Sequence, residues 1–166
     1  HLDGVSAATL VLVKDTPVVV DAAQGVARRL DPSSGEPAGD LCFDASDPAP
    51  IELASTSGSP WLVALTPTNG SLYLADLDGG SPCRVFRLGD VGLAGVRYGR
   101  PVERDGLVFV PDTVAGTVIV VDPERPTPPE DLKRIDIVDA RAVELMTHNG
   151  FVWYEEAGGD RVGVID

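Results

Sequence analysis

Four acidic residues occupy similar places beside predicted strands. Asp21, Asp112, Glu155 and Glu156 each lie in or near the turn that follows an apolar strand. Carboxylate oxygens are ligands that Ca²⁺ prefers, so carboxylates gathered at one place could hold this ion. A solvated rim on an acidic protein is the alternative, and Leu65–Pro67 interrupts the series at the corresponding place. We predict that these four residues bind a ligand. Ca²⁺ is the one cofactor that they suggest, but the sequence does not define a metal site.

Two short segments are further candidates for binding. Residues 97–100, with the sequence RYGR, form the only compact basic and aromatic cluster in the chain. Arg97, Tyr98 and Arg100 are therefore predicted to bind an anionic ligand or a partner's carboxylate, although an ordinary salt bridge with the acidic rim explains the cluster equally well. Pro123–Pro129 is a proline-rich connection that stiffens a loop or, as polyproline-like segments can, docks on a partner.

Catalytic chemistry has little support in the sequence. It contains no nucleophile elbow, phosphate loop, zinc motif or EF-hand loop. His148 is the one internal histidine, and it stands in a His-Asn-Gly triplet that favours a turn. We therefore predict no catalytic residue.

The two cysteines favour a disulfide. Cys42 and Cys83 are 41 residues apart, and neither has a histidine near it, which does not suit a zinc site or a catalytic thiol. If the protein is exported, a bridge between them would add roughly 4 kcal/mol of stability by closing the loop. Two buried free thiols are the alternative.

The charge balance is strongly acidic, with 26 acidic and 13 basic residues and a formal net charge of −13. Such a surface repels phosphate groups and anionic lipid heads, so we expect no nucleic-acid binding and no direct membrane binding.

Hydrophobic residues make up 43% of the chain, which suits a folded domain, and no apolar stretch is long enough to span a membrane. Because the chain begins with His1, we expect a processed or trimmed product.

An internal repeat supplies the elements that must position these residues. Four segments each contain an apolar strand, a short turn and an alternating strand that ends on aspartate: Pro17–Pro32, Trp61–Asp76, Leu107–Pro123 and Phe151–Asp166. The spacings between the terminal aspartates are 45, 46 and 44 residues, for Asp31, Asp76, Asp122 and Asp166. Aspartate at this place favours a turn, so we predict a structural role for all four.

Further strands flank each predicted hairpin. Those before it are Thr9–Val13, Ile51–Ser55, Pro101–Arg104 and Ala142–Met146, and those after it are Gly39–Phe43, Cys83–Leu88 and Leu132–Val138. Four strands in a repeat of about 45 residues are typical of a propeller blade. The predicted fold class is all-β: a β-propeller of four-stranded antiparallel blades, with about 3.5 to 4 blades in this chain.

The later copies resemble a known repeat. Phe109–Asp112 followed by Gly116–Asp122 is similar to the repeat of the YVTN-type propellers, a quinoprotein- and NHL-like group, and so is Val152–Glu155 followed by Arg161–Asp166. The resemblance implies the architecture of nearly the whole chain. It does not imply one activity, because such propellers include surface-layer proteins, binding modules and enzymes.

The predicted domain, 1–166, divides into blades at about 5–45, 46–90 and 96–139, with an incomplete blade at 140–166. An open ring leaves strand edges that invite pairing. Three arrangements follow: a fragment of a longer propeller, which we favour, a compact small ring, or two copies that assemble a larger one.

These observations favour a non-catalytic, extracytoplasmic propeller module, secreted or in the cell envelope, within a larger exported bacterial protein. Its expected partner is a protein or a cell-wall component, together with a second copy or the remainder of its own chain to complete the ring. One alternative is a propeller enzyme, either a lactonase-like hydrolase or a quinoprotein-like oxidoreductase. The other is the sensor ectodomain of a membrane protein.

Overall fold

The computed structural model describes residues 8–41, 51–54, 58–78, 84–89, 97–125, 127–137 and 142–165. Cys42, Cys83 and Asp166 lie outside these ranges, so the predicted disulfide and the fourth terminal aspartate lie outside the described residues. Within the ranges, the chain forms strands, turns and one short 3-10 helix, η1 (Pro129–Asp131). No helix in them is long and apolar enough to cross a membrane.

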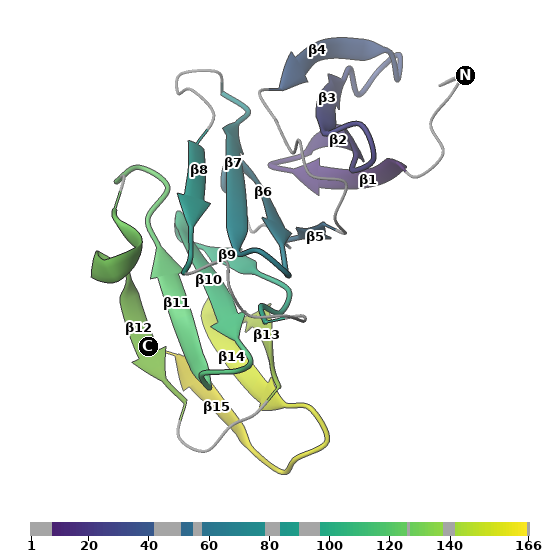
Figure 1. Cartoon of the computed structure of the whole chain (residues 1–166). Helices are drawn as coiled ribbons and strands as arrows, with labels where there is room; N and C mark the ends of the chain where they lie inside the picture. The colour runs from purple at the N-terminus through teal and green to yellow at the C-terminus, as the bar shows by residue number, and fades with distance from the viewer. Residues whose placement is uncertain are drawn as a thin grey trace.

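The strands form four antiparallel sheets, each an up-and-down meander in sequence order, which we call blades 1 to 4 (Figure 1). Blade 1 contains β1 (Ala8–Val13), β2 (Thr16–Asp21), β3 (Val26–Leu30) and β4 (Pro37–Leu41). Blade 2 contains β5 (Glu52–Leu53), β6 (Trp61–Thr66), β7 (Ser71–Asp76) and β8 (Arg84–Arg87). Blade 3 contains β9 (Val102–Arg104), β10 (Leu107–Asp112), β11 (Thr117–Val121) and β12 (Lys133–Asp136). Blade 4 contains β13 (Val143–His148), β14 (Phe151–Glu156) and β15 (Val162–Ile165).

The predicted hairpins are the central strand pairs of the blades, from β2 with β3 to β14 with β15. Their turns need glycine because the backbone passes through positive φ, where glycine has no Cβ to clash. Gly70 and Gly116 both have φ of +66°, and their N–H groups bond to Thr66 O at 3.0 Å and Asp112 O at 2.9 Å. The hairpin prediction is confirmed. So is the turn at His148, which ends β13 before Asn149 and Gly150.

The aspartates that end the first three repeats have the predicted structural role. Asp31 Oδ1 accepts the N–H groups of Ser33 at 2.8 Å and Ser34 at 3.0 Å. Asp76 Oδ1 accepts from Asp78 N and Asp122 Oδ1 from Glu124 N, both at 2.9 Å. The Ser33 hydroxyl, then the two serine amides, hold the pKa of Asp31 below its usual value. Each carboxylate therefore fixes the turn that follows the third strand of its blade.

The flanking strands differ from prediction mainly in length. The inner strand of blade 2 is reduced to the two residues of β5, within the predicted Ile51–Ser55. The last inner strand, β13, begins and ends slightly later than the predicted Ala142–Met146. Among the described residues blade 4 has three strands.

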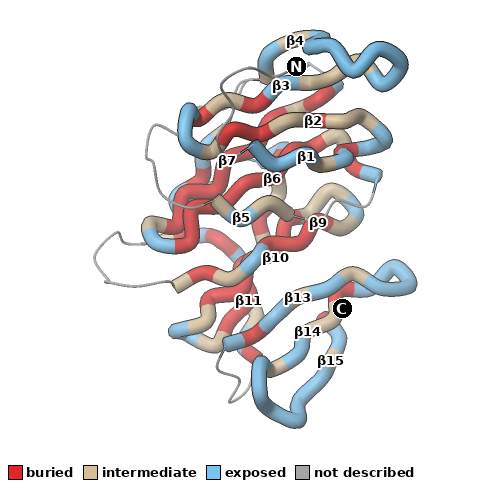
Figure 2. Tube along the Cα trace, turned by 90° about the vertical axis from the view of Figure 1, so that its right-hand side faces the viewer, coloured by how far each residue is buried: buried red, intermediate tan, exposed pale blue. Residues whose placement is uncertain are grey.

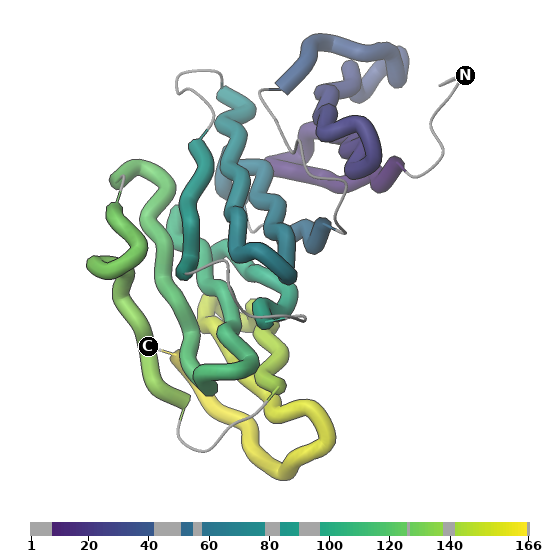
Figure 3. Tube along the Cα trace, in the orientation of Figure 1, coloured from purple at the N-terminus to yellow at the C-terminus, as the bar shows by residue number. Residues whose placement is uncertain are grey.

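The blades pack face to face in sequence order, and three apolar clusters join them. Val18 and Leu62 belong to the cluster between blades 1 and 2, and Leu65 and Val110 to the one between blades 2 and 3. Val152 belongs to the cluster between blades 3 and 4. Figures 1 and 3 place blade 1 and blade 4 at opposite ends of this row.

Arginines add hydrogen bonds from one blade to the backbone of another. Arg29 of blade 1 donates to Leu77 O, just after β7, at 2.8 Å. Arg84 of blade 2 donates to Pro123 O, the matching carbonyl after β11. Lys14 also pairs with Asp78 at 3.0 Å, although both side chains are exposed and such pairs contribute little.

Candidate functional site

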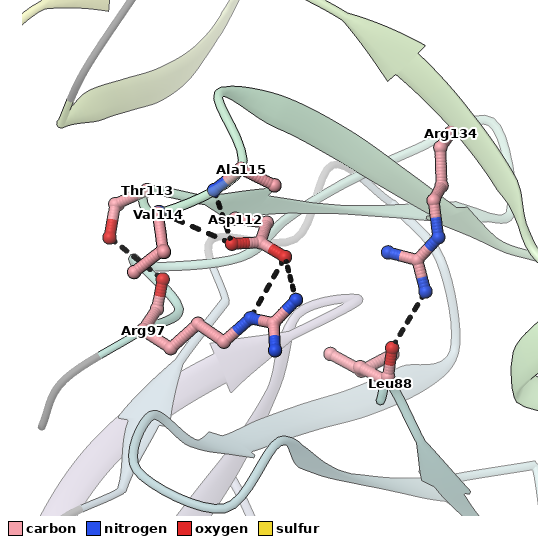
Figure 4. A network of polar contacts seen from close by, with 7 residues as sticks. All are labelled: Leu88, Arg97, Asp112, Thr113, Val114, Ala115 and Arg134. Carbon is pink, nitrogen blue, oxygen red and sulfur yellow. Dashed lines mark hydrogen bonds and ion pairs between the residues drawn. The ribbon is translucent and has the colours of Figure 1, made fainter. Parts of the chain in front are cut away.

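The segment that links blade 2 to blade 3 is held by a buried ion pair. Arg97 donates from Nε at 3.0 Å and from Nη2 at 2.7 Å to one oxygen of Asp112, the last residue of β10 (Figure 4). The Asp112 side chain is fully buried, whereas that of Arg97 is 20% exposed. The ordinary salt bridge that the sequence offered as the alternative explanation is therefore present.

Asp112 also organises the hairpin turn of blade 3. Its Oδ1 accepts the N–H groups of Val114 at 3.2 Å and Ala115 at 3.0 Å. Thr113 closes the network, because its hydroxyl at 2.7 Å and its N–H at 2.9 Å both donate to Arg97 O. Burial alone would raise the pKa of Asp112. The hydrogen bonds from Arg97 and Ala115, with the charge of Arg97, outweigh burial and hold this pKa below its usual value.

The other residues of the RYGR cluster also face inward or bond to the backbone. Tyr98 is buried in the cluster between blades 2 and 3, and its backbone pairs with Asp112. A Cβ on Gly70 would lie 2.6 Å from the Tyr98 ring, so the tyrosine packs directly on the hairpin turn of blade 2. Arg100 is bonded through Nε to Leu53 O at 3.0 Å. This cluster joins two blades, and its role as a ligand site stays a prediction.

The structure does not gather the predicted carboxylates. Asp21 is buried and accepts the N–H groups of Ala23 and Gln24 in its own turn, at 3.0 and 3.1 Å. Glu155 is exposed and Glu156 half-buried at the end of blade 4, the far end of the row from blade 1. Over the described ranges, no group of three or more His, Cys, Asp or Glu side chains could hold a metal ion. The Ca²⁺ site stays a prediction.

A groove of about 490 Å³ lies elsewhere, on the outer side of blade 2. Its lining residues come from the outer strand β8 and, in blade 3, from the loop before η1 and the first residue of η1: Arg84, Val85, Phe86, Arg87, Thr127, Pro128 and Pro129. Of the two walls, the proline-rich segment was predicted to dock on a partner, whereas the strand predicted at Cys83–Leu88 was given no binding role. The signal for β8 was available, since an outer strand with an exposed valine between two arginines is unusual on an acidic protein.

Comparison with known proteins gives a fold but no family. No protein-family model matches the chain, and no curated protein matches it. The crystal structure of Myxococcus xanthus glutaminyl cyclase aligns with a TM-score of 0.49 and 22% identity, over 95% of this chain and 64% of that one. The dihydro-heme d1 dehydrogenase NirN, in complex with DHE, aligns with a TM-score of 0.55 and 17% identity, over 96% of this chain and 35% of that one.

The sheets and the likeness to NirN together define the class of fold. The chain is an all-β protein of the β-propeller type, built from antiparallel blades of three to four strands. It spans under two thirds of the glutaminyl cyclase chain and about a third of the NirN chain. Propellers carry both enzymes and binding modules, so the fold alone does not separate these functions.

Proposed function

We propose that this chain is a non-catalytic binding module of the YVTN propeller type, and that it captures an extended, acidic segment of a partner protein along β8. The observation that carries the proposal is the groove between β8 and the loop 127–129. A protein partner fits this groove better than a small ligand, because one wall is a strand, which can pair with an extended segment of another protein.

The lining of the groove indicates that it follows the edge of the strand. All four residues of β8 contribute to it, although neighbouring side chains of a strand point to opposite faces. Only a groove along the backbone edge touches all four. β8 is the last strand of its sheet, so this edge offers N–H and C=O groups to an added strand.

The side chains favour an occupant that alternates apolar and acidic residues. Val85 is 50% exposed, and Pro128 and Pro129 line the same groove. Arg84 and Arg87 stand at the two ends of β8, and they are cations on a protein of net charge −13. Their charges complement carboxylates on a bound segment, which would both orient and select it.

An extracytoplasmic location belongs to the same proposal. It is supported by the two cysteines, by the acidic composition and by the sparse catalytic chemistry in the sequence. Counting free thiols in the protein purified without reductant tests this part, because a disulfide between Cys42 and Cys83 leaves none.

Fluorescence anisotropy with a labelled peptide of alternating glutamate and valine tests the binding proposal. We expect saturable binding that weakens about tenfold or more in Val85→Asp and Arg87→Glu, and that falls as salt is raised. Lys133→Glu is the matched control, since it makes the same charge reversal on β12, the outer strand of blade 3. This variant should bind within about twofold of the parent.

Two results would contradict binding of the peptide in the groove. Equal affinity in the parent and in Val85→Asp would exclude the groove as the binding place. Binding that follows net charge alone, so that Lys133→Glu loses as much as Arg87→Glu, would reduce the interaction to non-specific attraction.

A further inference from the structure

Each blade presents two different faces to its neighbours. Its forward face packs on the next blade in sequence, and its backward face packs on the preceding one. In blade 2 the forward face carries Trp61, Val63 and Leu65, and the backward face carries Leu62 and Ala64. Because strand residues alternate, the same positions have the same assignment in every repeat. Every contact between consecutive blades is therefore forward face on backward face.

Among the described residues, no blade packs on the forward face of blade 4. Met146, Trp153 and Val164 are direct cross-strand neighbours on this face, and Val162 continues it. Met146 is 45% exposed and Val162 is 62% exposed. The opposite face of the same strands, with Val152, is buried against blade 3. Figure 2 shows the contrast between the pale β13 to β15 and the red strands of the inner blades.

Blade 1 has the complementary open face, since no blade in the described ranges packs on its backward face. Leu10 and Leu12 lie opposite Val19 and Pro17 on this face and are 63% and 67% exposed. On the opposite face of β1, Val13 is buried against blade 2 and Val11 is half-buried there. Six of the eight large hydrophobic side chains that are exposed in the described ranges belong to blades 1 and 4.

We propose that these two faces bind each other between two copies of the chain, with blade 4 of each copy packed on blade 1 of the other. The structure already contains this type of contact between each pair of consecutive blades. The two open faces are the forward and backward members that such a contact needs, and they lie at opposite ends of one row. A head-to-tail contact made twice closes a ring of two chains.

The charged residues on the two faces support this pairing. Glu144 and Glu155 lie directly opposite each other on the forward face of blade 4, and like charges in that relation destabilise a strand pair. The backward face of blade 1 supplies an arginine, Arg28, which is opposite Val19 and half-exposed in a surface pair with Asp40. A second copy therefore brings Arg28, together with its cross-strand partner Asp40, to a face with two adjacent carboxylates.

The mass of the chain by light scattering after size exclusion is the first test. We expect a dimer at about 100 μM that dissociates on dilution. Leu12→Glu and Val164→Glu each place a charge in one of the two faces and should raise the dissociation constant by at least about 30-fold. Val114→Glu is the matched control, since Val114 is 65% exposed on the turn of blade 3 and on neither face, and it should leave the dimer unchanged.

Mixing the two disrupted variants tests the head-to-tail geometry. A mixture of Leu12→Glu with Val164→Glu retains one intact pair of faces, so it should form a weaker dimer that neither variant forms alone. A dimer through two copies of the same face would instead survive in one of the single variants.

Two results would overturn the proposal. The first is a monomer at about 100 μM, which would leave further blades of the same polypeptide as the cover for these faces. The second is a dimer that persists in both Leu12→Glu and Val164→Glu. Circular dichroism of each variant confirms that it is folded, which is expected because the substituted side chains are exposed. The peptide assay on β8 is independent of this outcome, because that groove lies on neither end face.

Discussion

Blades 2 and 3 differ from blades 1 and 4 in how the same repeat is buried. All six residues of β6 are buried, although the strand pattern of the repeat alternates. In β14, at the matching place in blade 4, only Val152 is buried. Trp61 and Phe151 begin these two strands, and they are 5% and 43% exposed. An inner blade has a neighbour on both faces and an end blade on one.

The burial of a side chain in this fold therefore depends on where its blade lies in the row. The repeat specifies a sheet with two apolar faces, and a sheet of this kind is satisfied only when both faces are covered. Stability is therefore expected to be concentrated in the inner blades, where a side chain of a given type should contribute more than in an end blade.

The largest difference in unfolding free energy is expected between a leucine buried between the inner blades and a leucine on an open end face. Leu65→Ala removes a fully buried side chain between blades 2 and 3 and should lower the free energy of unfolding by about 3 to 4 kcal/mol. Leu12→Ala, on the open face of blade 1, should cost less than about 0.5 kcal/mol in the monomer. Urea denaturation at low protein concentration measures both. Similar losses would mean that the end face of blade 1 is covered in solution.

The next difference concerns the aspartates that end the second strands. Asp112→Ala leaves Arg97 largely buried without its partner and should cost about 3 kcal/mol. Asp21→Ala removes two turn hydrogen bonds, and the described residues give Asp21 no cationic partner, so about 1 kcal/mol is expected. Urea midpoints at neutral pH give the comparison.

The pH dependence of the Asp112→Ala effect is the control for the ion pair between Asp112 and Arg97. Because the pKa of Asp112 is lowered in the native state, its contribution is complete above the unfolded value of about 4 and is lost as the pH falls through the native value. The stability difference between the parent and Asp112→Ala should therefore shrink below about pH 4. A difference that stays constant there would argue against the ion pair.

The smallest difference is expected for glycines in the hairpin turns. Gly70→Ala meets both a positive φ and the Tyr98 ring and should cost about 2 kcal/mol. Gly158→Ala in blade 4 has a similar φ of +76° but no atom within 4 Å of the added Cβ, so about 1 kcal/mol is expected. Thermal melts of the two variants measure the gap, and equal losses would show that Tyr98 moves aside at no cost.

The sequence predicted the strands, their turns and the capping aspartates, but not which polar side chains contact each other in the folded chain. The hairpins, their glycine turns and the capping aspartates follow from local rules of alternation and turn chemistry, which do not depend on the rest of the chain. The charge of Arg97 and Asp112 suggested binding. Their direct contact, between the link that precedes blade 3 and the end of β10, depends on how the chain packs and gives both a structural role, while their role in binding stays a prediction.

The amino-acid sequence by itself determined the repeat and the apolar character of both faces of each blade, because both are periodic properties of the chain. Only the tertiary structure decided which faces are covered. The same is true of the groove, whose walls, β8 and Pro128–Pro129, are separated by about 40 residues and meet only because blade 3 packs beside blade 2. Packing brings distant segments together, and no local pattern records which segments those are.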